Sequence, residues 1–470
     1  MTYRRRLLVL AICCLSLFLV SLDSSITNMA LPSIQRDFSA RVSSLQWTID
    51  AYAVVLASLL LLSASTADRV GRRRIFQIGL AVFTLASLLC SLAPNIQSLI
   101  AFRMLQAVGG SMLNPVAMSI VTNTFIDPKE RARAIGIWGA VFGVGMALGP
   151  VVGGALVDAV GWRSVFWINV PIGIAAIALT ARFVPESRAP HPRRLDPVGQ
   201  LLVIAILGSL TYGIIEAPQA GWGSAQTMVC FAVAVVAVAV LVPYEKRRAE
   251  PLLDPRFFAS IPFSAATLTA ITALASLAGF LFLNAIYLQT VRGFSPLQAG
   301  LLTLPAAVMI LVLAPIAGRV VAARGPRLPL VTAGIAIAVA GFLLTTISAT
   351  TPVGYLVLAY VVFGVGLGLV NPPITNTAVS GMPRAQAGVA AAVASTSRVV
   401  GNALGVAVLG AVVTSHVHGP VTAGFSSASH IAWWIMGISG IAVVVLGWVG
   451  TSARARRSAE RLAVEELVSA

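Results

Sequence analysis

Four charged residues stand inside long apolar stretches of the sequence: Asp23, Asp50, Arg103 and Arg398. Each stretch is about 20 residues long, the length of a helix that crosses a lipid bilayer. Charges inside such segments are rare and costly, and they mark proton relays, ion pairs and ligand sites. These four residues are therefore the first candidates for chemistry.

Asp23, Asp50 and Arg103 fall at a similar depth, in the outer half of the membrane, at about 1.5 Å of rise per helical residue. A nearby arginine favours an ionised carboxylate, so a carboxylate whose partner comes and goes gains and loses a proton. We predict proton coupling at Asp23, with Arg103 as its modulator and Asp50 as a further carboxyl. The alternatives are a permanent Asp23–Arg103 bridge that fixes packing and a hydrated interfacial position for Asp50. For Arg398, bonds to backbone carbonyls and contact with a ligand both stay open.

The composition indicates what holds these residues. Hydrophobic residues make up 58% of the 470 residues and charged residues 10%, whereas soluble domains carry about 25% charged residues. We predict an all-α integral membrane protein with 14 transmembrane helices. The expected spans are 7–29, 45–65, 75–93, 97–121, 134–157, 163–181, 197–216, 226–244, 262–288, 297–321, 328–347, 353–375, 386–413 and 430–450.

Basic residues cluster in alternate loops between these spans. With a cytoplasmic N-terminus, most of the 32 Lys and Arg residues lie in cytoplasmic loops, which is the usual asymmetry of membrane proteins. Both termini are therefore expected in the cytoplasm. The net charge of +16 follows from this topology, and no nucleic-acid partner is expected.

The chain also repeats itself. Gly109–Pro115 aligns with Gly366–Pro372, and Met146–Gly149 aligns with Asn402–Gly405, in the same order along the sequence. Two homologous halves of six spans, with two spans inserted between them, account for this spacing, as in transporters built from parallel repeats. We predict a 6+2+6 arrangement with an N-terminal half at 1–190, an insertion at 191–256, a C-terminal half at 257–452 and a cytoplasmic tail at 453–470.

The fifth span contains residues that a helix normally avoids. Gly costs about 1 kcal/mol and Pro about 3 kcal/mol in a solvated helix interior, but small residues let membrane helices approach closely. We predict a hinge against a helix of the other half, with span 13, which carries Gly401, Gly405 and Gly410, or its neighbour as the candidate partner; plain close packing is the alternative. The predicted hinge residues are Gly145, Gly149, Pro150, Gly153 and Gly154.

Four segments together resemble the motifs of one family. They are Leu22–Pro32, Asp68–Arg73, Arg103–Gly110 and Gly145–Gly154. In order and topology the chain is similar to the major facilitator superfamily, in its fourteen-span drug:proton antiporter branch. It departs from the usual motifs at Ala64 and Ala107, where the family usually has Gly, and the later spans lack the acids that some members use for substrates.

The resemblance implies a conformational latch in the loop after the second span. Its members are Asp68, Arg69, Gly71 and Arg72, with a dock expected near Gly388 at the start of span 13. A basic loop placed there by topology alone is the alternative.

Spans 1, 2, 4 and 5 and their repeat counterparts are expected to wall a substrate cavity. Lipophilic substrates suit apolar walls that carry a few polar and aromatic side chains. The predicted substrate-binding residues are Asn28, Gln106, Asn114, Trp138, Phe280, Asn284, Tyr287, Asn371 and Asn376.

No enzymatic motif and no phosphate-binding GxxxxGK[ST] loop occurs in the sequence, so ion-driven transport is favoured over a nucleotide-driven pump. We predict a proton-coupled antiporter of the bacterial cytoplasmic membrane that exports small lipophilic compounds or drugs by alternating access. It is expected to act as a monomer among membrane lipids, without cofactor or metal. A dedicated exporter of one metabolite, lipid or self-made antibiotic, an uptake symporter, and a channel or non-transporting receptor are the alternatives.

Overall fold

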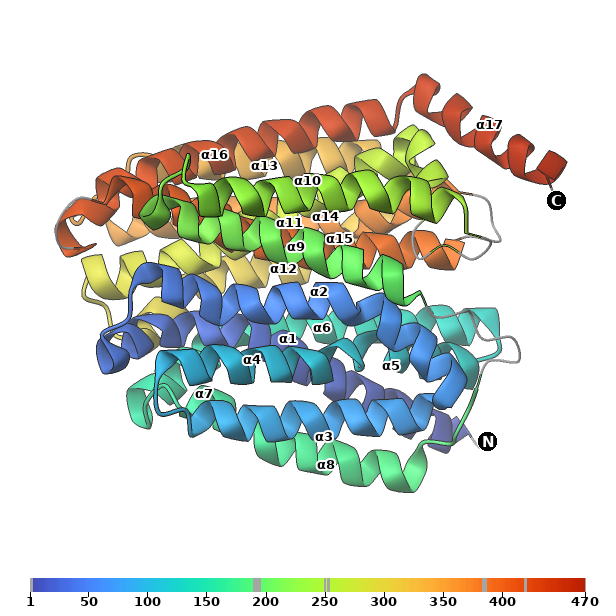
Figure 1. The fold of residues 1–470 in the computed structure, drawn as a ribbon, viewed down its shortest axis with the longest axis horizontal. Helices are drawn as coiled ribbons and strands as arrows, with labels where there is room; N and C mark the ends of the chain where they lie inside the picture. Colours follow the sequence, from blue (N-terminus) through green and yellow to red (C-terminus); the bar gives the residue numbers. More distant parts are fainter. Residues whose placement is uncertain are drawn as a thin grey trace. The chain divides into compact units, whose positions relative to one another are not determined.

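The computed structural model describes residues 3–188, 196–248, 251, 254–382, 387–417 and 421–469, and these residues are helical except for short connections. Figure 1 shows the succession of helices along the chain. The elements are α1 (Tyr3–Phe38), α2 (Val42–Val70), α3 (Arg72–Ser91), α4 (Ile96–Ser111), α5 (Asn114–Thr124), α6 (Pro128–Ala159), α7 (Ser164–Trp167), α8 (Asn169–Phe183), α9 (Pro197–Ala220), α10 (Ala225–Lys246), η1 (Pro255–Ala259), α11 (Ile261–Ile286), η2 (Tyr287–Val291), α12 (Pro296–Arg324), α13 (Arg327–Leu344), α14 (Val353–Ser380), α15 (Ala387–His416), α16 (Val421–Gly450) and α17 (Ala453–Ser469).

Fourteen helical segments among the described residues are long and apolar enough to cross a membrane, which confirms the predicted number of spans. Most of them extend beyond the predicted limits because helices continue past their apolar centres; the first runs over Tyr3–Phe38. The third and eleventh, Arg72–Ser91 and Arg327–Leu344, end two or three residues before the predicted limits. The fourth span is broken into α4 and α5 at Met112 and Leu113, where Pro115 cannot donate a backbone hydrogen bond. The aligned Pro372 lies inside the unbroken α14.

The chain forms two compact units. One consists of Met1–Ile204 and Phe294–Leu301, and the other of Ala205–Gly293 and Leu302–Ala470. The division passes through α9 and through the first turns of α12, so the two inserted helices do not make a unit of their own. The predicted 6+2+6 boundaries describe the order along the chain and stay a prediction.

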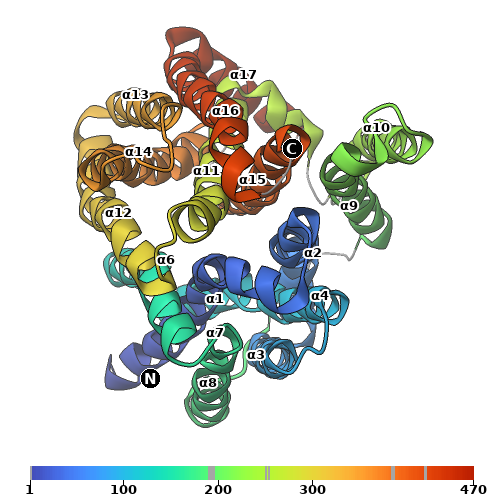
Figure 2. The same cartoon turned by 90° about the vertical axis from the view of Figure 1, so that its left-hand side faces the viewer.

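The inserted helices α9 and α10 lie side by side (Figures 1 and 2). They meet closely at Gly213, where an added Cβ atom would stand 3.0 Å from the Phe231 ring. Large hydrophobic side chains along α10 are exposed, among them Val235 at 68% and Val236 at 60%. A helix that is apolar all round in this way is suited to lipid contact.

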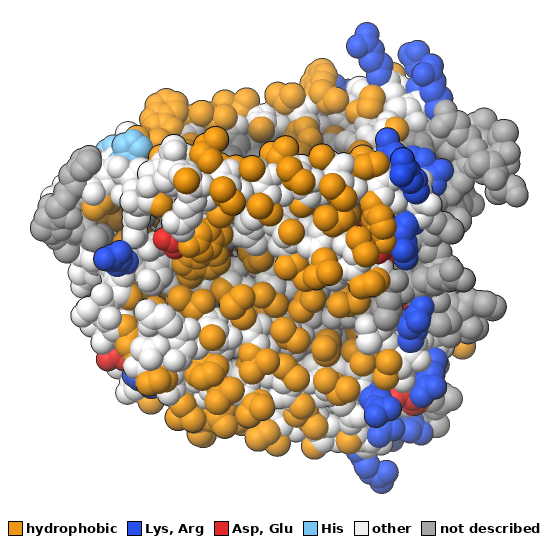
Figure 3. Space-filling model, viewed as in Figure 1, with side chains coloured by type: hydrophobic (Ala, Val, Ile, Leu, Met, Phe, Trp, Pro, Cys, Tyr) orange, Lys and Arg blue, Asp and Glu red, His pale blue; other side chains and the backbone are white. Residues whose placement is uncertain are grey.

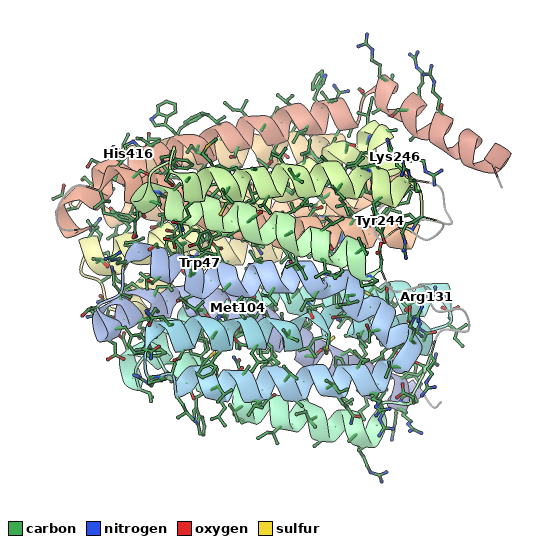
Figure 4. The ribbon with its side chains drawn as sticks, in the orientation of Figure 1. Trp47, Met104, Arg131, Tyr244, Lys246 and His416 are labelled. Atoms are coloured by element: carbon green, nitrogen blue, oxygen red, sulfur yellow. The ribbon has the colours of Figure 1, made fainter. Side chains whose placement is uncertain are left out.

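The surface of the helices follows the pattern of a membrane protein. Hydrophobic side chains cover their middle parts, and most visible Lys and Arg side chains lie toward one end of the helices (Figure 3). In the first unit, Arg131 lies toward this end and Trp47 toward the opposite end (Figure 4). In the second unit, Lys246 and His416 are separated in the same way. Each unit therefore has one basic end, as the loop charges predicted.

Candidate proton and substrate sites

An ion pair is buried at the centre of the first unit. Arg103 Nη1 on α4 donates to Asp23 Oδ2 on α1 at 2.6 Å, and the two residues are 1% and 0% exposed. The same Nη1 donates to Gln106 Oε1 at 2.6 Å, and Gln106 Nε2 donates to Asp23 Oδ1 at 2.9 Å. Asp23, Arg103 and Gln106 thus form a closed triangle that satisfies both carboxylate oxygens.

Three further helices join this triangle. Asn169 Nδ2 on α8 donates to Asp23 Oδ1 at 2.8 Å, and Gln106 Nε2 donates to Ser87 Oγ on α3 at 2.8 Å. Arg103 Nε donates to the backbone oxygen of Thr48 on α2 at 3.1 Å. We call Asp23, Ser87, Arg103, Gln106 and Asn169 the acid network. Its members lie on four helices of one unit, and the bond from Arg103 to the Thr48 backbone adds α2 as the fifth.

Two aromatic rings also lie near the guanidinium group of Arg103. The guanidinium carbon of Arg103 lies 4.2 Å from the centre of the Tyr52 ring and 5.7 Å from that of Phe166. The neighbouring Met104 is 44% exposed (Figure 4), so the two side chains leave α4 on different faces. Removing one partner of a buried ion pair costs about 3–5 kcal/mol, because the other charge is left uncompensated. The acid network is therefore both a structural tie and a charge-sensitive site.

The sequence predicted the pairing of Asp23 with Arg103 but not the rest of the acid network. Gln106, predicted to contact substrate, also bonds the acid, and its contact with substrate stays a prediction. Asn169 and Ser87 escaped notice because single neutral polar residues are common in membrane helices, where they hydrogen-bond to neighbours.

Asp50 differs sharply from Asp23. Its side chain is 0% exposed, and neither carboxylate oxygen has a hydrogen-bond partner among the described residues. Thr48 and Tyr52 are one turn apart on α2 and both meet Arg103, whereas Asp50, two residues from each, points to the opposite side of the helix. Asp50 is therefore separate from the acid network, and its burial does not fit a hydrated interfacial position.

The predicted latch residues surround the turn between α2 and α3. Arg72 Nη2 and Nε donate to Asp68 Oδ1 at 2.8 and 3.0 Å. Gly71 has a φ of 125°, which favours glycine. Arg69 is exposed. The dock expected near Gly388 lies where side chains fall outside the described residues.

Glu186 is a further member of this turn that the sequence did not reveal. Its carboxylate accepts the backbone N–H groups of Arg73 and Arg74 at 3.0 and 3.2 Å. An acid at this position satisfies free donors of the first turn of α3 and complements the helix dipole. A Cβ atom on Gly71 would lie 2.7 Å from Glu186 Oε1, so the glycine also makes room for the carboxylate.

The glycines of α6 pack against α1. A Cβ atom added to Gly145 would overlap Ser21 Oγ, one added to Gly149 would overlap Ser25 Oγ, and one added to Gly153 would lie 2.7 Å from Ile26 Cγ1. Their spacing of four residues places the three glycines on one face of the helix. They let the backbones of α1 and α6 approach within the first unit.

The predicted contact with a helix of the other half occurs at Gly154, which meets the backbone of Pro296 at the start of α12, a helix of the predicted C-terminal half. The glycine stripe itself meets α1 and not span 13, the candidate partner. Within the second unit, Gly401 and Gly405 of α15 meet the backbone of Ile271 and Ala275 on α11. Each of the two aligned glycine stripes thus packs against a helix of its own half. The spacing of the glycines defines one face of a helix but does not identify the helix opposite that face.

The predicted substrate residues of the first unit carry unsatisfied polar atoms. Among the described residues, Asn28 Oδ1, Asn114 Oδ1 and Trp138 Nε1 are buried without a hydrogen-bond partner. Asn114 lies at the break between α4 and α5. Unpaired polar atoms are uncommon in folded proteins. These three, together with Asn284 of the second unit, whose Nδ2 is likewise buried without a partner among the described residues, are therefore the stronger part of the predicted set.

The predicted residues of the second unit have packing partners. Phe280 lies 4.4 Å from Phe363 between ring centres and is 1% exposed. The Tyr287 hydroxyl donates to the backbone oxygen of Ser348 at 2.7 Å, and Asn284 Oδ1 accepts from Tyr360. Asn376 is exposed. Their contact with substrate stays a prediction.

The remaining member of that set, Asn371, bonds the fourth intramembrane charge. Arg398 Nε on α15 donates to Asn371 Oδ1 on α14 at 3.1 Å. Arg398 Nη2 donates to Thr375 Oγ1 at 2.5 Å and to the Asn371 backbone oxygen at 3.4 Å. All three acceptors are neutral.

Comparison with known proteins decides the family. The family model described as Major Facilitator Superfamily matches residues 13–406. The chain belongs to the major facilitator superfamily. Within the superfamily it is 38% identical to the multidrug resistance protein Stp of Mycobacterium tuberculosis, over 88% of this chain and 76% of that protein.

Two further relatives of this superfamily member carry related names. The tetracenomycin C resistance and export protein of Streptomyces glaucescens is 37% identical over 85% of this chain and 74% of that protein. The multidrug efflux pump LfrA of Mycolicibacterium smegmatis is 36% identical over 88% of this chain and 82% of that protein.

Solved structures agree with the superfamily fold. A peptide transporter POT in complex with sulfate matches with a TM-score of 0.69 and 15% identity, over 96% of this chain and 95% of that chain. A bacterial homologue of the human lysosomal transporter Spinster, inward-facing and occupied, matches with a TM-score of 0.67 and 18% identity, over 99% of both chains. At these identities the likeness shows the fold alone.

Proposed function

We propose that this chain is a proton-coupled exporter of small lipophilic compounds, drugs among them, in the cytoplasmic membrane of a bacterium. It acts as a monomer by alternating access of its two six-helix halves. Relatives named for multidrug resistance, for tetracenomycin C resistance and export, and for multidrug efflux support the direction and the substrate class. The buried carboxyls support proton coupling.

The observation that carries the proposal is the burial of the Asp50 carboxyl group without a hydrogen-bond partner among the described residues. A buried carboxylate without a hydrogen-bond partner is costly, and binding a proton would remove its charge. Conformations that wet Asp50 from one side then release the proton to that side. Asp23 serves as the second acid, since protonating it would remove the counter-ion of Arg103 and loosen contacts among five helices.

Transport in proteoliposomes tests this assignment. The purified protein is reconstituted, a pH gradient is imposed, and uptake of ethidium into the lumen is followed by fluorescence. Asp50→Asn should retain ethidium binding but lose accumulation driven by the gradient. Asp23→Asn should lose accumulation and also lower the unfolding temperature, because Arg103 stays buried without its partner.

The matched control is Asp37→Asn. Asp37 lies at the end of α1, is 43% exposed, and accepts hydrogen bonds from Trp162 Nε1 and Arg163 Nη1 at 2.9 and 2.8 Å. This variant should transport like the wild type. Full gradient-driven accumulation in both Asp23→Asn and Asp50→Asn would refute proton coupling at these acids.

The same proteoliposomes distinguish the proposed pump from two alternatives, a dedicated exporter and a channel. A dedicated exporter would move one compound out of a panel of unrelated lipophilic drugs, whereas the proposed pump moves several. A channel would only equilibrate ethidium. Accumulation above the outside concentration that a protonophore abolishes excludes the channel.

A further inference from the structure

The longest stretch of the sequence without an Asp or Glu residue contains the intramembrane Arg398. No Asp or Glu occurs between Asp254 and Glu460, so no acid in the whole C-terminal six-helix half can balance Arg398. The contrast with the N-terminal half is direct, because Arg103 is neutralised there by Asp23 at 2.6 Å. Among the residues that the structure describes, Arg398 is held only by the neutral groups of Asn371 and Thr375.

The hydrogen bonds of Arg398 leave one edge of the guanidinium open. Nε and Nη2 bond to α14, whereas Nη1 has no hydrogen bond among the described residues. The side chain is part-buried, so the group is neither sealed in the core nor freely solvated. Its position is fixed by three bonds while two donors remain available.

A second unsatisfied group lies on the same face of α15. Asn402 follows Arg398 by four residues, which places the two side chains one above the other on the helix. Asn402 Oδ1 is buried and has no hydrogen-bond partner among the described residues. An open cationic edge and an unpaired amide therefore stand one turn apart within the second unit.

We propose that Arg398 binds an anionic group of the exported compound, with Asn402 as a second polar contact. A carboxylate is the best fit, because guanidinium groups pair with carboxylates through parallel N–H···O bonds. An uncompensated charge in a membrane protein is costly, and a bound anion offsets that cost. The preferred substrates are then lipophilic acids. This inference rests on the proposed function and names its substrate class.

A matched pair of probes tests it. Pyrenebutyrate and its neutral amide, pyrenebutyramide, share a lipophilic ring system and differ in charge. In the proteoliposome assay, the wild type should accumulate pyrenebutyrate in preference to the amide. Arg398→Gln should weaken binding and transport of pyrenebutyrate by about tenfold or more, the range expected when a charge-assisted hydrogen bond is lost. Arg398→Lys should keep part of this activity.

Ethidium and a distant arginine supply the controls. Arg398→Gln should accumulate the cation ethidium at least as well as the wild type. Arg327→Gln changes an exposed arginine of the same unit, whose guanidinium stacks 3.7 Å from the Trp448 ring centre, and should not alter the preference for pyrenebutyrate.

Two results would overturn the inference. Equal transport of pyrenebutyrate by the wild type and Arg398→Gln would show that the charge is not used. Parallel loss of ethidium and pyrenebutyrate transport, with a lower unfolding temperature, would show that Arg398 only joins α14 to α15. Both differ from a failure of the proposed function, in which the wild type accumulates neither probe.

Discussion

Two acidic residues at the turn between α2 and α3 have different partners, one a side chain and the other the backbone. Within the described residues, the side chain of Asp68 bonds only that of Arg72, whereas Glu186 accepts backbone N–H groups at the start of α3. The backbone N–H of Arg72 also donates to the oxygen of Ser187 at 2.9 Å. The turn can therefore keep its shape when Asp68 changes its partner.

This division gives a paired prediction at the scale of the residue. Asp68→Asn should slow substrate turnover several-fold and leave the unfolding temperature near that of the wild type. Glu186→Gln should instead lower stability by about 0.5–1 kcal/mol, the value of a charge at a helix N-terminus, with a smaller effect on turnover. Thermal unfolding in detergent and initial transport rates provide the two readouts. Wild-type turnover in Asp68→Asn would contradict the latch.

At the scale of the element, close packing of α1 with α6 depends on glycine at particular positions. Gly145, Gly149 and Gly153 leave no space for a side chain, whereas nothing lies within 4 Å of a Cβ atom added to Gly136 or Gly139 of the same helix. The stripe joins two helices of the first unit. The proposed hinge role of α6 thus requires that it move together with α1.

Glycine-to-alanine substitutions at two positions of α6 distinguish the effect of close packing from the effect of helix propensity. Gly149→Ala should force α1 and α6 apart and lower both transport and stability, because Ser25 and the backbone of Ile26 block the added methyl group. Gly139→Ala adds the same atom in open space and should be neutral or slightly stabilising, since Ala is the better helix former. Thermal unfolding and export are compared in both variants. Equal effects of the two substitutions would contradict close packing.

How far the sequence could anticipate these features depends on the kind of information each one needs. Apolar length determines the number of spans, and the rarity of buried charges singled out Asp23 and Arg103. The neighbours of a helix face are set by tertiary packing, so the partner of Gly149 was missed. Two features depend on side-chain positions that sequence spacing does not determine. They are the lack of a hydrogen-bond partner for Asp50 among the described residues and the three hydrogen bonds of Arg398.

At the scale of the whole molecule, the basic ends of the two units support a cytoplasmic location for both termini. Cysteine labelling tests this topology in a variant that lacks the native cysteines. A cysteine at Ile126, which is 79% exposed between α5 and α6, should react with an impermeant maleimide only after cells are opened. A cysteine at Leu92, 66% exposed after α3, should react in intact cells. The reverse pattern would invert the topology.

The stretch without acids has a consequence for the electrical work of the transport cycle. Asp23, Arg103, Asp50 and Arg398 balance when Asp50 is ionised, and they leave one positive charge when Asp50 carries its proton. In the proposed proton-coupled cycle, a protonated, empty carrier is drawn inward by an inside-negative membrane potential. The same potential drives the deprotonated carrier outward with a monoanion bound. Each charge moved gains about 2.3 kcal/mol per 100 mV, so voltage alone would sustain export when the pH difference has collapsed.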